Sequence, residues 1–345
     1  MRQAVILQAQ GIASSQHNLN KIDLQLAQND VVVLIGKNTS GKEHLLQALK
    51  CNITLEHGSI NFDDKSLDSL PKNEYQLTQR QLAYLNQNPK FIDNLDLFQN
   101  IEAIAKICGH SRATYTPYIE DILTYVGLSG KRHYLAANLN PLQRLKLDLA
   151  RNLYTKPKAL LIEDVTNQLD IKSIVEYIEL LQRIRQDYKL AIVISSNEIE
   201  IIKSLATRAI VLKNGAIIEE LTPFELYVSP QSTIAREFLS YICKSELPVS
   251  LRKQLKPANN GDTRVLMRIV FSKVTNAEQA LAHASQRYEA NININLAYQE
   301  AVGAKDINII VAAIKFAKDT QAEFAKSLNE AAIFNEVIGY VSDFS

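Results

Sequence analysis

The chain has no tryptophan, only three cysteines and two methionines, and no long apolar run. Cys51, Cys108 and Cys243 show neither paired nor metal-ligand spacing, which is typical of buried thiols in a reducing compartment. Apolar runs such as residues 31–35 are far shorter than the about 20 residues that a membrane-spanning helix needs. No apolar signal peptide opens the sequence. These absences predict a cytoplasmic protein without transmembrane helices.

An excess of charge of one sign is also missing. Lys and Arg total 38 and Asp and Glu total 37, which gives a formal net charge of +1. Nucleic-acid-binding domains usually carry a strong basic surplus, so we expect no nucleic-acid partner. The 345 residues, 46% of them hydrophobic, are enough for about two ordinary domains with their own cores.

Residues 31–49, VVVLIGKNTSGKEHLLQAL, read as a buried strand, a tight loop and a helix. Such a loop binds phosphate through a nest of backbone N–H groups, a helix N-terminus and a lysine. Any α/β domain can carry two glycines and a lysine in this arrangement, so the interpretation depends on the motifs that follow. The candidate nucleotide-binding residues are Gly36, Lys37, Asn38, Thr39, Ser40, Gly41, Lys42, Glu43 and His44.

Further motifs follow in a fixed order. A strand ends at Gln87, LNPLQ occupies residues 139–143, LLIED occupies residues 160–164, and Asn197 follows another apolar strand. This succession resembles the ATP-binding cassette of ABC transporters. The resemblance makes Gln87 the Q-loop glutamine and places Asn197 at the switch-histidine position. It assigns the Walker B strand to residues 160–164, the end of the D-loop to Asp170, and the signature to Leu139, Asn140, Pro141, Leu142 and Gln143.

The resemblance implies ATP and Mg²⁺ as cofactors, yet the catalytic positions are substituted. Walker B normally ends in Asp then Glu, whereas this chain has Glu163 then Asp164, and the shorter Asp164 loses reach as a base. Glu43 replaces the hydroxyl residue that binds Mg²⁺, and its carboxylate would repel phosphates. The candidate catalytic residues are Asp164, Glu163, Gln87 and Asn197, and the candidate Mg²⁺ ligands are Glu43, Glu163 and Gln87.

The signature substitutions are more severe. In the family, the Ser and Gly backbone of one subunit closes over the γ-phosphate bound by the other. Here Pro141 brings no N–H donor and Leu142 adds bulk where the backbone must approach closely. Asn197 can donate a hydrogen bond but cannot carry the positive charge of a histidine. We therefore expect ATP hydrolysis to be weak or absent.

A second domain follows residues 244–263, which contain two prolines and an Asn-Asn-Gly turn signal and read as a linker. The pattern beyond it predicts strands and helices in the order βαββαβ. This tail resembles the ACT-like regulatory domain, named for its Asn-Ile-Leu motif, of methionine-importer ATPases. Asn293, Ile294 and Asn295 fall where that motif is expected, with Asn in place of Leu. Asn293 is the candidate effector residue, with a polar strand-edge residue as the alternative.

The predicted fold class is an α/β P-loop NTPase of the ABC cassette type, followed by a small α+β ACT-like domain. The predicted domains are the cassette at 1–243, with a helical subdomain at about 88–138, the linker at 244–263 and the ACT-like domain at 264–345.

The resemblance implies an ATP-binding subunit of a methionine importer. Such a subunit is a homodimer at the cytoplasmic face of the inner membrane, docked on transmembrane permease subunits and regulated by methionine. The alternative is a non-catalytic scaffold or amino-acid sensor beside an intact ATPase. A soluble translation or repair factor is disfavoured by the single cassette and the balanced charge.

Overall fold

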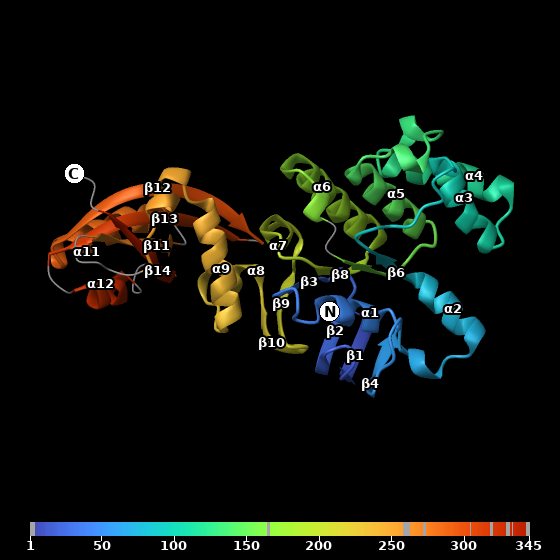
Figure 1. Ribbon diagram of the computed structural model, residues 1–345, viewed down its shortest axis with the longest axis horizontal. Helices are drawn as coiled ribbons and strands as arrows, with labels where there is room; N and C mark the ends of the chain where they lie inside the picture. Colours follow the sequence, from blue (N-terminus) through green and yellow to red (C-terminus); the bar gives the residue numbers. More distant parts are fainter. Residues whose placement is uncertain are drawn as a thin grey trace. The chain divides into compact units, whose positions relative to one another are not determined.

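The computed structural model describes residues 4–163, 166–257, 263–271, 274–303, 305–317, 320–328, 332 and 334–342 (Figure 1). The chain forms two compact units, Met1–Glu220 and Leu221–Ser345, which we call unit 1 and unit 2. The division lies before helices α8 (Pro223–Val228) and α9 (Thr233–Glu246), which therefore group with the C-terminal unit. The predicted linker contains the end of α9 and a further helix, α10 (Val249–Gln254). The predicted domain boundaries remain a proposal.

Unit 1 is built on a six-stranded sheet with the strand order β10-β9-β3-β8-β7-β6. Neighbouring strands from β9 to β6 run parallel. Every residue of β3, β7 and β8 is buried, as expected for a parallel sheet covered on both faces. The strands are β3 (Val31–Ile35), β6 (Leu82–Leu85), β7 (Ala159–Ile162), β8 (Ala191–Ser195), β9 (Arg208–Lys213) and β10 (Ala216–Leu221).

A second, antiparallel sheet in unit 1 has the order β2-β1-β4-β5. Its strands are β1 (Val5–Ser14), β2 (Leu19–Ala27), β4 (His57–Phe62) and β5 (Lys65–Ser66). One hydrophobic core joins the inner face of this sheet, the central sheet and the helix α1 (Lys42–Leu49). Because Leu45, Leu46, Ala48 and Leu49 are buried in that core, α1 is fixed where it leaves the glycine loop.

Helices cover the rest of unit 1. They are α2 (Lys72–Gln81), α3 (Leu97–Ile107), α4 (Arg112–Tyr125), α5 (Pro141–Leu153), α6 (Ile171–Tyr188) and α7 (Ile199–Leu205). Short 3-10 turns are η1 (Leu67–Ser69), η2 (Ser129–Lys131), η3 (Ala136–Asn138) and η4 (Thr166–Gln168). The helices α3 and α4 lie within residues 88–138 and pack on each other and on α5. Across the described part of the chain, no helix is both long enough and apolar enough to cross a bilayer.

The buried Asp148 of α5 makes the stability of unit 1 dependent on pH. Burial raises the pKa of Asp148 to about 7, against an opposing effect of Arg151. The raised pKa means that the folded state binds the proton more tightly than the unfolded chain, whose Asp pKa is about 3.9. The contribution of Asp148 to the stability of unit 1 is therefore most favourable below about pH 4 and declines as the pH rises towards 7.

We expect Asp148→Asn to stabilise unit 1, and the gain to be larger at pH 8 than at pH 5 by roughly 2 kcal/mol. Urea denaturation at the two pH values measures this difference. Asp121→Asn, at an exposed position of α4, is the matched control and is expected to show no such pH dependence. Equal gains at both pH values would contradict the raised pKa.

Unit 2 contains a four-stranded antiparallel sheet with the order β12-β13-β11-β14. Its elements follow the predicted βαββαβ order. They are β11 (Thr263–Phe271), α11 (Val274–Arg287), β12 (Ala290–Val302), β13 (Lys305–Phe316), α12 (Gln321–Leu328) and β14 (Phe334–Ser342). Apolar residues of β11 and β13 form one core with α11 and α12. Figure 1 shows these two helices on the same face of the sheet.

Arg268 lies on β11 between core residues and points to the other face of this sheet, where only 1% of it is exposed. Its Nη1 donates to the Tyr227 carbonyl oxygen of α8 at 3.2 Å and to Glu336 Oε1 of β14 at 3.4 Å. Cys243 of α9 also donates to Glu336. Burial raises the pKa of both Glu336 and Cys243, the thiol to about 12. The helices α8 and α9 are therefore held on this face through a buried ion pair.

Candidate nucleotide-binding site

The glycine loop after β3 has the backbone shape that its two glycines require. Gly36 and Gly41 have φ angles of 152° and 96°. A Cβ atom on Gly36 would lie 2.5 Å from the Leu212 carbonyl oxygen, and one on Gly41 would lie 3.0 Å from that of Asn18. Glycine alone avoids both the strained backbone and the steric clash. Lys37, Asn38 and Thr39 are exposed, while Ser40 is buried.

Lys42 is the first residue of α1, and its side chain extends back to the start of the glycine loop. Its side chain is buried, and Nζ donates to the carbonyl oxygens of Gly36 at 2.5 Å and Lys37 at 3.0 Å. The loop backbone, the helix N-terminus and a buried ammonium group thus meet at one point. This is the combination that binds phosphate in a P-loop.

Asn197 contacts the first residue of the loop twice. Its Oδ1 accepts the Gly36 N–H at 3.2 Å, and its Nδ2 donates to the Gly36 carbonyl oxygen at 3.1 Å. Asn197 follows β8, which is adjacent to β3 in the sheet, so the two residues lie side by side although 161 positions separate them. Both polar atoms of the switch-position side chain are used within the protein.

Glu163 follows β7 and is held by three donors. Its Oε1 accepts hydrogen bonds from the Tyr84 hydroxyl and from Gln47 Nε2, the latter at 3.2 Å. Its Oε2 accepts the Gln87 N–H at 3.4 Å. Burial, followed by contact with Glu163, raises the pKa of Tyr84, so this hydroxyl stays a donor. Asp164 lies outside the described residues.

These groups surround one cavity of about 230 Å³ beside the loop, lined by Asn38, Lys42, Glu43, Gln87, Glu163, Ser195 and Asn197. Six of the seven lining residues were predicted as nucleotide, metal or catalytic residues, and Ser195 was not. Tyr84 and Gln47 were also missed, although Gln47 lies one helical turn after Glu43 and Tyr84 lies three residues before Gln87. Within the described ranges, no three His, Cys, Asp or Glu side chains are placed to hold a metal ion.

The predicted signature residues form the beginning of α5. Asn140 is the N-cap: its side chain accepts the Gln143 N–H at 2.9 Å, and Gln143 Oε1 accepts the Asn140 N–H at 3.2 Å. Pro141 occupies the first turn, and Leu139 and Leu142 are buried. Both side chains that could reach a phosphate are engaged in capping. Asp170 has the same role at α6, where it accepts the Ser173 N–H at 2.7 Å.

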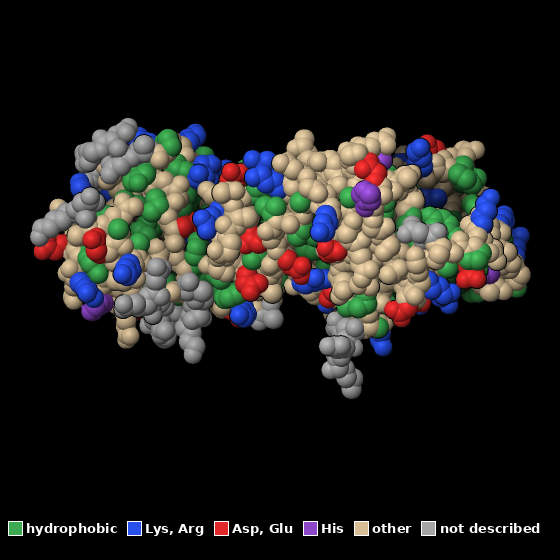
Figure 2. Space-filling view, turned by 90° about the horizontal axis from the view of Figure 1, so that it is seen from below, with side chains coloured by type: hydrophobic (Ala, Val, Ile, Leu, Met, Phe, Trp, Pro, Cys, Tyr) green, Lys and Arg blue, Asp and Glu red, His purple; other side chains and the backbone are tan. Residues whose placement is uncertain are grey.

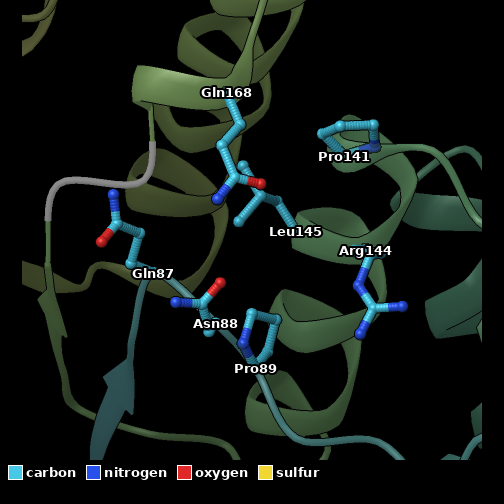
Figure 3. Close-up of a pocket in the computed structure, with 7 residues that line it drawn as sticks. All are labelled: Gln87, Asn88, Pro89, Pro141, Arg144, Leu145 and Gln168. Carbon is cyan, nitrogen blue, oxygen red and sulfur yellow. The ribbon is translucent and has the colours of Figure 1, made fainter.

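The signature and the Q-loop share a small cavity of about 70 Å³. Figure 3 shows its lining residues, which come from the segment after β6, from α5 and from η4. They are Gln87, Asn88, Pro89, Pro141, Arg144, Leu145 and Gln168. Gln87 therefore borders both this cavity and the one beside the glycine loop.

His44 lies in the first turn of α1 and is exposed. The ring of His17, from the loop between β1 and β2, approaches it edge-on with 5.6 Å between ring centroids. His17 is also hydrogen-bonded to Ser14 Oγ at 3.0 Å.

In unit 2, Asn293 is exposed on β12, at an edge of the sheet. The register of β12 shifts between Ile294 and Leu296, and there Asn295 Oδ1 accepts the Ala313 N–H of β13 at 2.9 Å. The side chain of Asn295 thus replaces a backbone acceptor at a β-bulge. This gives a structural reason for asparagine at the third position of the motif.

Comparison with known proteins shows which proteins this chain is similar to. Residues 19–167 match the family model described as ABC transporter. The methionine import ATP-binding protein MetN of Coxiella burnetii is 26% identical over 324 residues, which cover 94% of this chain and 92% of that protein. MetN of Rhizobium meliloti is 25% identical over 94% of this chain and 90% of its own length.

Solved structures agree on the fold. The cbiO1 structure from Clostridium perfringens, described as part of the ABC transporter complex cbiONQ, has a TM-score of 0.62 and 20% identity. It covers 72% of this chain and 97% of that one. The predicted cassette fold is confirmed: residues 19–167 are similar to the ABC transporter family, and the N-terminal part of the chain has the fold of a P-loop ATP-binding cassette.

Proposed function

We propose that the chain is the ATP-binding subunit of an ABC importer for methionine or a related amino acid, with impaired ATP hydrolysis. The similarity to MetN proteins supports the importer role because it extends over 94% of the chain and includes unit 2. The ABC transporter model alone matches only residues 19–167.

The observation that carries the impaired hydrolysis is the capping of α5. In this family the signature backbone and serine bind the γ-phosphate of the opposite subunit. Here the Asn140 side chain and the Gln143 N–H bond to each other, and Pro141 has no N–H to offer. Each composite site of a homodimer would contain this defect.

The residues fit a nucleotide better than they fit its metal. The glycine loop and Lys42 have the geometry for phosphates, and the oxygens of Glu43, Glu163 and Gln87 are those that would hold Mg²⁺ beside them. When bound, Mg²⁺ supplies charge neutralisation between the phosphates. Glu163 already accepts hydrogen bonds from Tyr84, Gln47 and Gln87, which opposes a regular Mg²⁺ site.

The proposed assembly is a homodimer docked on two permease subunits at the cytoplasmic face of the membrane. Unit 2 would bind methionine as a regulator near the exposed Asn293. The basic and acidic side chains are interspersed on the face seen in Figure 2. The second candidate function is a non-catalytic scaffold or sensor beside an intact ATPase, which the capped signature favours.

The test is Mg·ATP binding and steady-state hydrolysis by the purified chain, with and without methionine, beside the double variant Glu43→Ser/Asn197→His. We expect binding with little turnover in the natural chain and more turnover in the variant. Turnover of the natural chain that methionine suppresses would establish a working importer ATPase and contradict the impaired site. Methionine binding without nucleotide binding would favour the sensor.

A further inference from the structure

The described lining of the cavity beside the glycine loop carries more carboxylates than cations. The backbone of the loop and the buried ammonium group of Lys42 suit phosphates. The same lining includes the carboxylates of Glu43 and Glu163. A P-loop lysine reaches the β- and γ-phosphates, and the next residue faces the position between them. A third phosphate at Lys42 would therefore bring negative charge beside the carboxylate of Glu43.

Groups that would stabilise a third phosphate are engaged elsewhere or uncharged. Asn197, at the switch position, uses both Oδ1 and Nδ2 on the backbone of Gly36. Glu163 is held at the cavity wall by Tyr84 and Gln47, so it does not turn away from an approaching phosphate. The remaining lining residues, Asn38, Gln87 and Ser195, are neutral. One cation thus faces two anions in the described lining.

We infer that this P-loop is a nucleoside diphosphate site, which binds ADP in preference to ATP. A diphosphate brings less negative charge to the lining that contains Glu43 and Glu163 than a triphosphate does. A third phosphate adds negative charge at that point and gains no hydrogen bond from Asn197. The inference rests on the proposed function to the extent that the chain binds adenine nucleotide. If the inference holds, the nucleotide that occupies the cassette at rest is the diphosphate and not the triphosphate.

The experiment is equilibrium binding of ADP and ATP to the full chain by titration calorimetry, in EDTA and in Mg²⁺. We expect ADP to bind about tenfold more tightly than ATP in both buffers, which corresponds to about 1.4 kcal/mol. In Glu43→Gln, which removes one carboxylate with little change of shape, the preference should fall towards equality. Adding Asn197→His to that variant should turn the preference to ATP.

Glu74→Gln is the control, because it removes an exposed acid of α2 outside the cavity and should keep the natural preference. Equal or tighter binding of ATP by the natural chain in either buffer would overturn the inference, as would an unchanged preference in Glu43→Gln. Failure to bind either nucleotide would overturn it as well. A separate measurement tests the proposed function: methionine uptake when the chain is co-produced with permease and solute-binding subunits. Absence of uptake would contradict the proposed function and would leave the nucleotide preference to the binding experiment.

Discussion

Replacing Arg268 by alanine is expected to lower the free energy of unfolding of unit 2 by about 3–5 kcal/mol. Arg268 is almost completely buried, and its guanidinium is the cation that faces Glu336 and the Tyr227 carbonyl oxygen. Removing it leaves the half-buried carboxylate of Glu336 without its ion pair and leaves a cavity between the sheet and α8. Both effects destabilise the same interface.

Denaturation followed by hydrogen exchange of peptides from β11 and β14 would measure this loss in unit 2 directly. Arg264→Ala, the same change at a half-buried position of the same strand, is the matched control and should cost less than about 1 kcal/mol. The double variant Arg268→Met/Glu336→Leu tests the cause, because replacing both charges by apolar groups should recover most of the stability. If the double variant is as unstable as Arg268→Ala, the ion pair is not what holds the interface.

The sequence was sufficient to predict features that depend on local spacing. The separation of Gly36, Gly41 and Lys42 gives the phosphate loop because backbone sterics and one helix start determine its shape. The apolar runs in residues 264–271 and 306–314 likewise predict strands of unit 2. Asn140 also follows a local rule, since an asparagine followed three residues later by glutamine is typical of a capping box.

Features that depend on long-range contacts were not predictable. The bonds between Asn197 and Gly36 join residues on adjacent strands that are far apart in the chain, and no spacing in the sequence encodes them. The Tyr84 hydroxyl meets Glu163 because β6 and β7 are neighbours in the sheet. Arg268 interrupts an apolar run in β11, and the packing of α8 and α9 on that face of the sheet buries it.

Converting Asn140-Pro141-Leu142 to Ser-Gly-Gly in the Glu43→Ser/Asn197→His background is expected to raise ATP turnover by about 10²–10³-fold. That range is the usual cost of losing one hydrogen-bond donor to a developing oxyanion. The change restores a backbone N–H at position 141 and removes the bulk of Leu142. Serine retains the N-cap of α5, so the main structural cost is that of two glycines in the first turn, about 1 kcal/mol each.

Steady-state phosphate release measures the effect, and the same variant with Lys42→Ala must return to background if the turnover arises at this P-loop. In the proposed homodimer the signature acts on the opposite subunit, so the gain should also depend on protein concentration. A gain that is independent of concentration would place the reaction within one subunit and contradict a composite site. A natural chain that already hydrolyses ATP within tenfold of the converted variant would show that capping of α5 does not limit turnover, and the substituted motifs would then belong to an active importer.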